Sequence, residues 1–359
     1  ALSLRMRVEE MSFSEWDAAL PDDGFEPFHT VAALEAVESH WAGELRLYGG
    51  FKGQEPVGLL PVFIRQHRLG RIVSSPPVGF GIGRLGPIQL TTSPKQRKRE
   101  AGNKKFVRQV IETIDATDQL TLFRLVGTTT YTDPRPFKWN GFDATPDFTY
   151  RIDLESQTAD QVLKSFSRDL RKDVRNRDDV GISIRSGEDG DARRIYEAMV
   201  ERYRTQGKSQ PVSWEFIQDL LAAVGDRARV YVAESDRGEF LSGMIVLYSN
   251  STAYNWKGGT KPSNLDTSVS VNNLLHWEVI TDIIDDPALD SVTNYDFYTA
   301  NNERLSRYKS SFNGSLVPYY TIESNGVPMA LAKKAYRTAM SRTIPRGKQL
   351  VVGNVLKDN

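Results

Sequence analysis

The sequence predicts a mixed α/β protein built from two domains. Strand-like and helix-like segments alternate along the chain, which is typical of α/β proteins and not of helical bundles or sandwiches. The 359 residues suit two domains of roughly 150 residues each. A weak internal repeat supports this division: residues 47–64 and 230–247 both read as a strand, a polar turn and a second strand. Gly243 takes the place of Gly58 at the start of the second strand.

Residue preferences place the individual elements. Strands are predicted where β-branched and aromatic residues concentrate, at residues 45–48, 57–64, 120–126, 229–233, 243–248 and 292–298. Helices are predicted over residues 106–114, 158–174, 192–203, 214–224 and 271–284. Thr158 and Gln161 fit a capping box, and Pro287 closes the last helix.

A domain boundary is expected near residues 145–155. This gives a first domain over residues 1–150, a second over residues 151–322, and a basic helix and tail over residues 323–359. We expect the tail to pack on the first domain. The alternative for this basic segment is contact with tRNA or with an anionic membrane surface.

Composition excludes several functional classes. The 46 basic residues balance the 46 acidic ones, so any contact with nucleic acid must come from a local patch. The absence of cysteine excludes thiol catalysis, disulfides and thiolate metal sites. The four histidines match no metal-ligand spacing, and we predict neither a metal nor a cofactor. Because neither a signal peptide nor a membrane-spanning segment is recognised, a cytoplasmic location is expected.

Three polar stretches are candidates for a site. The helix from Thr158 has a basic face whose guanidinium groups suit phosphates or carboxylates, although a solvated face is the alternative. The basic residues 95–105 are interpreted as a solvated loop. In residues 255–259, Trp256 and Lys257 precede two glycines that let a ligand approach the backbone, the alternative being a turn with an exposed tryptophan. The helix at residue 270 begins with a polar turn whose free N–H groups suit an anionic ligand.

The densest polar segment is residues 294–314. Asp296 lies between apolar strand residues, where a carboxylate costs free energy unless it is paired or hydrogen-bonded. Amides and basic side chains follow it, and an acid with several donors near a strand end is typical of an α/β site. No nucleophile motif, phosphate-binding loop or kinase signature is present, so hydrolase and nucleotide-triphosphatase functions have no motif behind them. His276 is interpreted as a core residue.

The second half of the chain resembles the Fem-type aminoacyltransferases. The likeness lies in residues 166–175, 256–260 and 273–277, and in Asp296 followed by residues 307–314, which are similar to the family's Phe-Lys-x-x-Phe-Gly ending. Residues 58–62, 75–77 and 86–87 are similar to the family's first domain. Two departures are that Tyr308 replaces the phenylalanine before the lysine and that Asn313 separates Phe312 from Gly314.

The resemblance implies two acetyltransferase-like (GNAT) domains in tandem and an N-acyltransferase. The donor would be an aminoacyl-tRNA or an acyl-CoA, and the acceptor an amine on a cell-envelope precursor, a peptide or a small metabolite. Lys309 matches the motif lysine, which implies that it stabilises developing negative charge, and Asp296 would orient or deprotonate the amine. The implied substrate-binding residues are Arg168, Arg171, Arg175, Tyr254, Trp256, Lys257, Asn273, Asn301, Arg304 and Tyr308.

A non-catalytic two-domain scaffold for a peptide, a glycan precursor or a partner protein is the alternative function. The presence of Asp296 and Lys309 favours the enzyme. The pyrophosphate-loop signature of simple acetyltransferases is not clearly present, and residues 65–70 hold at best a fragment of it. This favours a donor other than acyl-CoA.

Overall fold

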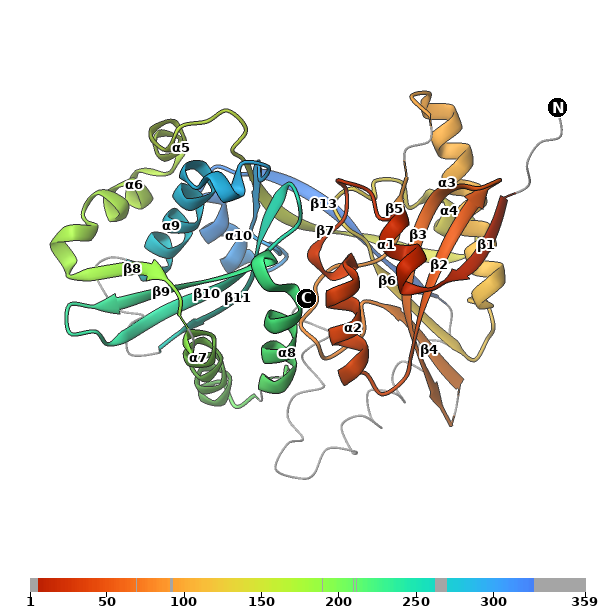
Figure 1. The fold of residues 1–359 in the computed structure, drawn as a ribbon, viewed down its shortest axis with the longest axis horizontal. Coiled ribbons are helices and arrows are strands. Elements are labelled where there is room, and N and C mark those ends of the chain that lie inside the picture. The colour runs from red at the N-terminus through yellow and green to blue at the C-terminus, as the bar shows by residue number, and fades with distance from the viewer. Residues whose placement is uncertain are drawn as a thin grey trace. The chain divides into compact units, whose positions relative to one another are not determined.

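The computed structural model describes residues 6–68, 70–90, 93–188, 190–208, 210, 212–261 and 270–325. These residues form two compact units (Figure 1). Unit 1 comprises residues 6–147 with 318–325, and unit 2 comprises residues 148–317. The two boundaries fall inside strands β7 (Phe142–Asp153) and β13 (Ser315–Ser324). Most of the predicted basic C-terminal helix lies outside the described residues.

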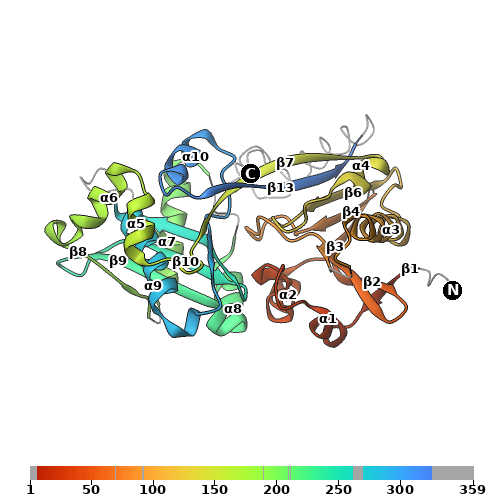
Figure 2. The ribbon, with the colours of Figure 1, turned by 90° about the horizontal axis from the view of Figure 1, so that it is seen from above.

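Unit 1 is a sheet covered by helices on both faces. Its further elements are β1 (Met6–Met11), α1 (Phe13–Ala19), α2 (Val31–His40), β2 (Glu44–Lys52), β3 (Glu55–His67), β4 (Gly70–Ser75), β5 (Ile88–Gln89), α3 (Gln96–Ile114), β6 (Thr121–Val126) and α4 (Arg135–Trp139). The strand order is β1-β2-β3-β4-β6-β13. Helices α3 and α4 cover one face and α1 and α2 the other (Figure 2). Phe106 and Val110 of α3 pack in the core with Leu60.

Unit 2 has the same layered plan. Its elements are α5 (Ala159–Ser165), α6 (Arg168–Arg175), β8 (Ile182–Ser186), α7 (Asp191–Thr205), α8 (Trp214–Val224), β9 (Ala228–Ser235), β10 (Phe240–Tyr248), β11 (Thr252–Thr260), α9 (Val271–Asp285), β12 (Asn294–Asp296) and α10 (Glu303–Ser310). The strand order is β7-β12-β11-β10-β9-β8. Helices α5, α6 and α9 cover one face of this sheet, and α7 and α8 cover the other (Figure 1).

The two units repeat one topology, as the sequence predicts. In unit 1 the helices α1 and α2 separate β1 from the antiparallel strands β2-β3-β4, and in unit 2 the helices α7 and α8 separate β8 from the antiparallel strands β9-β10-β11. A helix then crosses to a parallel strand, so that α3 leads to β6 beside β4 and α9 leads to β12 beside β11. The repeat therefore extends well beyond the two hairpins on which it was predicted.

Gly58 and Gly243 each stand fourth in the second strand of their hairpin, as predicted, but they face different helices. A Cβ on Gly58 would lie 2.8 Å from the ring of Phe106 in α3, whereas a Cβ on Gly243 would lie 2.5 Å from Ile195 in α7. In the repeated topology α3 corresponds to α9, not to α7. Each glycine admits a close helix, but the two helices occupy different places in the repeat.

Three predicted elements need correction. The helix expected over residues 158–174 is two helices, because Phe166 is extended and the Ser167 side chain caps α6 by accepting the Leu170 N–H. The Thr158 capping box is confirmed. The basic residues 95–105, expected as a loop, begin α3, whose buried Asn103 and Phe106 hold it to the unit.

The third correction is the strand expected over residues 292–298. It is shorter, because β12 ends at Asp296. The chain then turns sharply, since Tyr298 adopts a left-handed backbone conformation with φ of 75°. The residues after this turn remain beside β7, since the Phe297 and Ala300 N–H groups donate to the carbonyls of Tyr150 and Phe148.

Unit 1 also contains a fully buried ion pair. Arg84 Nε lies 2.8 Å from Glu26 Oε1, and the two side chains are 0% and 3% exposed. The Arg84 guanidinium lies 5.2 Å from the centre of the Tyr319 ring, which adds a cation–π contact. These contacts join the segment before the short helix Pro27–His29 to the loop before β5 and to β13.

Candidate functional site

Strands β11 and β12 of unit 2 pair only where both begin. Their register joins Thr252–Tyr254 to Asn294–Asp296, after which β12 ends, and residues 255–260 of β11 have no strand partner on that side within the described ranges. The corresponding pair of unit 1 stays together to the last residue of β4. Among the described residues, the separation of the two parallel strands is therefore a feature of unit 2, and it falls where the sequence predicted a site.

A β-bulge lies in the same part of β11. Ile245 pairs with Lys257 and the next residue, Val246, pairs with Asn255, so Trp256 is the extra residue. A bulge interrupts the regular hydrogen-bonding ladder and redirects side chains, and bulges are frequent beside active sites. Trp256 therefore belongs to a strand, and the predicted alternative of a turn with an exposed tryptophan is wrong.

Two aromatic residues predicted for the site are buried. The Tyr254 ring meets the ring of Tyr298 edge-on, with centres 6.4 Å apart. The Trp256 ring meets that of Phe216 in α8, also edge-on and 6.4 Å apart. Both rings are built into unit 2, so their predicted role in lining an acceptor groove remains a prediction.

Lys257 is a half-buried cation at the bulge. Its Nζ lies 5.3 Å from the centre of the Trp256 ring, and no described acidic side chain pairs with it. Burial lowers the pKa of Lys257 to about 8, because removal from water disfavours the charged form. An appreciable share of this amine is therefore neutral at mildly alkaline pH.

Replacing Lys257 with Met is expected to stabilise the protein most at or below pH 8. There the folded chain must hold a charge that burial disfavours. Between pH 8 and 10.5 the unfolded chain keeps the proton and the folded chain releases it, so the wild type gains stability as the pH rises. The free energies of unfolding at pH 7 and pH 10 test this. If Lys257→Met changes the free energy of unfolding by the same amount at both pH values, the expectation is contradicted. Lys164→Met, at an exposed lysine, is the control.

Asp296 is a buried carboxylate at the end of β12. It is 1% exposed, and its Oδ1 accepts hydrogen bonds from Thr149 Oγ1 at 2.7 Å and from the Tyr298 backbone N–H at 2.6 Å. These bonds supply the stabilisation that the sequence argument required for a carboxylate in this position. They also link the acid to the left-handed turn at Tyr298. Backbone strain of this kind is concentrated at functional sites.

Lys309 of α10 holds the loop that follows Asp296. Its buried Nζ donates to the carbonyl oxygens of Phe297, at 2.8 Å, and of Thr299. The ammonium is thus anchored to the backbone on either side of Tyr298. These contacts make Lys309 a residue that positions the Asp296 loop. Its predicted catalytic role remains a prediction.

His276 is a core residue, as predicted. It is 3% exposed and its Nδ1 lies 2.7 Å from the hydroxyl of Tyr295. Burial and the nearby charge of Lys309 lower the pKa of His276 to about 3. The imidazole is therefore neutral at physiological pH.

The first turn of α9 already holds an anion of the protein itself. Asp173 of α6 accepts the Ser270 N–H at 3.3 Å and the Asn273 side-chain N–H at 2.7 Å. The anionic ligand expected at this turn would therefore meet the carboxylate of Asp173. Tyr308 lies near this turn. The centre of its ring is 6.0 Å from that of His276, and His276 lies one turn after Asn273 in α9.

The remaining predicted residues are not gathered at β11 and β12. Arg168 and Arg175 are exposed on α6, and the half-buried Arg171 donates to the Lys164 carbonyl at 2.8 Å. On a helical wheel Arg168 and Arg175 lie opposite the buried Leu170 and Val174, on the solvent side of α6, whereas Arg171 lies at the flank of the helix. Asn301 accepts the Phe148 N–H at 2.7 Å, and Arg304 is exposed.

Sequence reasoning missed three residues that the structure makes prominent, namely Thr149, Asp173 and Tyr298. Thr149 was assigned to a domain boundary, although it lies in β7 and binds Asp296. Asp173 is one of two acids, with Asp169, among the basic residues of this helix, and its spacing from Leu170 and Val174 gave no sign that it contacts α9. Nothing in the sequence marks Tyr298 as left-handed.

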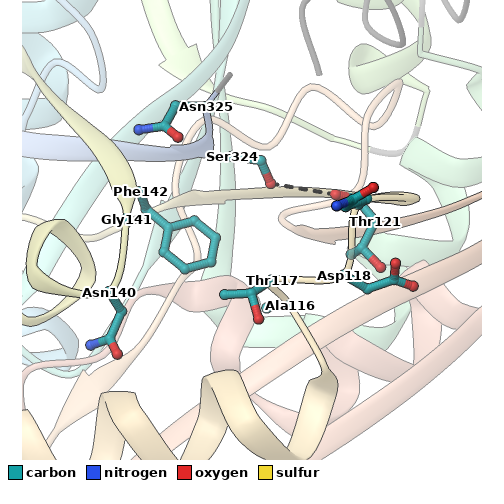
Figure 3. Close-up of a pocket in the computed structure, with 10 residues that line it drawn as sticks. Ala116, Thr117, Asp118, Thr121, Asn140, Gly141, Phe142, Ser324 and Asn325 are labelled. Carbon is teal, nitrogen blue, oxygen red and sulfur yellow. Dashed lines mark hydrogen bonds between the residues drawn. The ribbon is translucent and has the colours of Figure 1, made fainter. Parts of the chain in front are cut away.

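A pocket of about 210 Å³ lies in unit 1 (Figure 3). It is lined by the turn after α3, the start of β7 and the end of β13, and the Ser324 hydroxyl meets the Thr121 carbonyl across it. Ligand sites commonly enclose about 300–1,000 Å³. None of the predicted site residues lines this pocket, so it supports no role in the proposed chemistry.

Comparison with known proteins supports the fold. Residues 164–310, within unit 2, match the family model described as an acetyltransferase (GNAT) domain. The structure of FemX superposes with a TM-score of 0.62 at 11% identity, covering 88% of this chain and 96% of that one. No protein of curated function matches the sequence.

Two further solved structures share the fold. One is the C-terminal domain of a putative lysylphosphatidylglycerol synthetase from Agrobacterium fabrum, with a TM-score of 0.52, 12% identity and coverage of 77% of this chain and 84% of that one. The other is a tandem GNAT protein from the clavulanic acid biosynthesis pathway, with a TM-score of 0.50, 12% identity and coverage of 90% and 100%. The predicted α/β fold of two GNAT domains in tandem, and the likeness to the Fem-type fold, are confirmed. In the described part of the chain, no helix has the length and apolar character needed to span a membrane.

Proposed function

We propose that this protein is an N-acyltransferase whose reaction takes place in unit 2, where β12 ends and β11 continues beyond it. The observation that carries the proposal is the separation of these parallel strands beside the bulge at Trp256 and the buried Asp296. The match of residues 164–310 to an acetyltransferase domain supports the same class of reaction.

Amide formation by acyl transfer makes two demands on the site. The acceptor amine must lose a proton, and the acyl carbonyl must be stabilised while it carries negative charge. We assign the first task to Asp296, which orients or deprotonates the amine. The interrupted ladder at Trp256 and the ammonium of Lys257 lie on the neighbouring strand. We assign to them the second task, stabilising the negative charge on the acyl carbonyl. Lys309 positions the Asp296 loop through its two carbonyl contacts.

We further propose an aminoacyl donor in place of acyl-CoA. A helix N-terminus is a common binding site for pyrophosphate, because its free N–H groups and its dipole favour anions. At α9, Asp173 already accepts the Ser270 N–H, so its charge opposes a second anion there. The acceptor is an amine on an envelope precursor, a peptide or a small metabolite.

The test compares the rate of amide formation in wild type, Asp296→Asn and Asp290→Asn. Asparagine keeps an oxygen for the Tyr298 N–H but has no negative charge to accept a proton. We expect Asp296→Asn to lower kcat about 100-fold or more. Asp290→Asn changes the net charge equally at an exposed aspartate and should leave the rate unchanged. Equal rates in all three proteins would show that Asp296 has no part in the reaction.

A further inference from the structure

The carboxylate of Asp173 is fixed at the start of α9. Its Oδ2 accepts the Asn273 Nδ2–H at 2.7 Å and the Ser270 backbone N–H at 3.3 Å. These two bonds fix the direction of the carboxylate, so Asp173 presents an oriented pair of acceptor oxygens at this point of unit 2.

The amide of Asn273 has one orientation in this arrangement. Because Nδ2 donates to Asp173, the carbonyl oxygen Oδ1 must occupy the other side of the amide. Asn273 is 8% exposed, and Oδ1 is buried with no hydrogen-bond partner among the described residues. A buried acceptor without a partner is costly and calls for a ligand or another group that donates to it.

Tyr308 supplies a third oxygen. Its hydroxyl is buried and also has no hydrogen-bond partner in the described part of the chain. Burial, and then the charge of Asp173, raise the pKa of Tyr308 well above its usual value, so the phenol stays protonated and lies within electrostatic range of that carboxylate. The ring packs against His276, which shares a face of α9 with Asn273.

These three side chains are rich in acceptors and carry one negative charge. An anion is disfavoured there by Asp173, whereas a primary ammonium has three N–H donors, no acceptor and a positive charge. The basic side chains Arg168 and Arg175 of α6 lie on the opposite side of that helix from the apolar core and do not neutralise Asp173.

We propose that Asp173, Asn273 and Tyr308 form a binding site for a primary ammonium group of the substrate. This rests on the proposed function, in which two substrates carry such a group. One is an aminoacyl donor, through its free amino group, and the other is an acceptor with a second amine. The site selects substrates by their positive charge. It holds them through the N–H donors of the ammonium, which an acyl group without an amine lacks.

The test uses two probe molecules and their neutral counterparts. The first, 3′-(L-alanylamino)-3′-deoxyadenosine, is a stable mimic of the end of an aminoacyl-tRNA and is compared with its N-acetyl derivative. The second, N-acetylcadaverine, carries an ammonium without a nucleoside and is compared with N,N′-diacetylcadaverine. Binding is measured by calorimetric titration to wild type, Asp173→Asn, Tyr308→Phe and the control Asp169→Asn, which changes an exposed aspartate of the same helix.

We expect wild type and Asp169→Asn to bind one ammonium probe at least tenfold more tightly than its acetylated counterpart. Asp173→Asn should lose this preference, and Tyr308→Phe should reduce it about threefold or more. Asparagine keeps an oxygen for the Ser270 N–H, and thermal unfolding checks that both variants remain folded. An Asp173-dependent preference for the adenosine probe assigns the site to the donor, and one for N-acetylcadaverine assigns it to the acceptor.

The proposal is overturned if no probe shows a preference for its ammonium form, or if Asp173→Asn keeps the preference of wild type. These binding results do not depend on turnover. An Asp173-dependent preference in a protein without transferase activity would uphold the ammonium site and contradict the proposed function. Transferase activity without such a preference would uphold the proposed function and contradict the ammonium site.

Discussion

Replacing Lys309 with Met is expected to lower kcat about 100-fold or more. The variant loses both hydrogen bonds from Nζ to the carbonyls of Phe297 and Thr299, and bonds to charged groups each contribute about 1.5–3 kcal/mol. The Asp296 turn is then held less firmly, and a misplacement of about 1 Å at a reacting group can cost 100-fold in rate.

Two measurements separate the roles of Lys309. If it acts by positioning, the loss of kcat is accompanied by faster hydrogen exchange in residues 297–301. If it acts only by its charge, exchange stays as in wild type while kcat falls. Lys164→Met removes an exposed lysine of α5 and should change neither quantity. A Lys309→Met protein with the wild-type rate would exclude any function of this lysine in transfer.

The second large effect concerns the stability of unit 1. Arg84→Met leaves Glu26 buried without its partner, and breaking a buried ion pair in this way commonly costs about 3–5 kcal/mol. It also removes the cation–π contact with Tyr319. We expect hydrogen exchange to accelerate in residues 6–147 far more than in residues 148–317.

A double variant shows whether the buried charge is responsible. Replacing Glu26 with Leu together with Arg84→Met removes both charges, so much of the lost stability should return. If the double variant is no more stable than Arg84→Met alone, the loss comes from packing and not from an unpaired carboxylate.

Patterning along the chain was sufficient to predict the layered fold. Strands and helices with clear residue preferences, such as β10 and α9, fall where they were predicted, because their apolar faces are buried in one core. The break between α5 and α6 was missed because the apolar periodicity of Leu163, Phe166 and Leu170 continues across it. The change of direction at Ser167 comes from its cap, which is a local feature that periodicity does not record.

The site was predicted in part, for a related reason. Asp296 was found because a carboxylate between apolar strand residues needs partners, and the structure supplies Thr149 and Tyr298. Thr149 lies 147 residues earlier in the chain, so no local pattern could reveal it. The arginines of α6 were chosen for their charge, but the helix turns Arg168 and Arg175 toward solvent, while Asp173 turns toward α9.

The most direct test of the central claim is whether the purified protein forms an amide bond from an activated donor. Radiolabelled aminoacyl-tRNAs and radiolabelled acyl-CoA are supplied in separate reactions, each with an extract of small amine acceptors. We expect label from aminoacyl-tRNA in a product that resists alkali and ribonuclease, and less or none from acyl-CoA. Label from acyl-CoA alone would contradict the proposed donor, and no transfer from either donor would contradict the assignment as an N-acyltransferase.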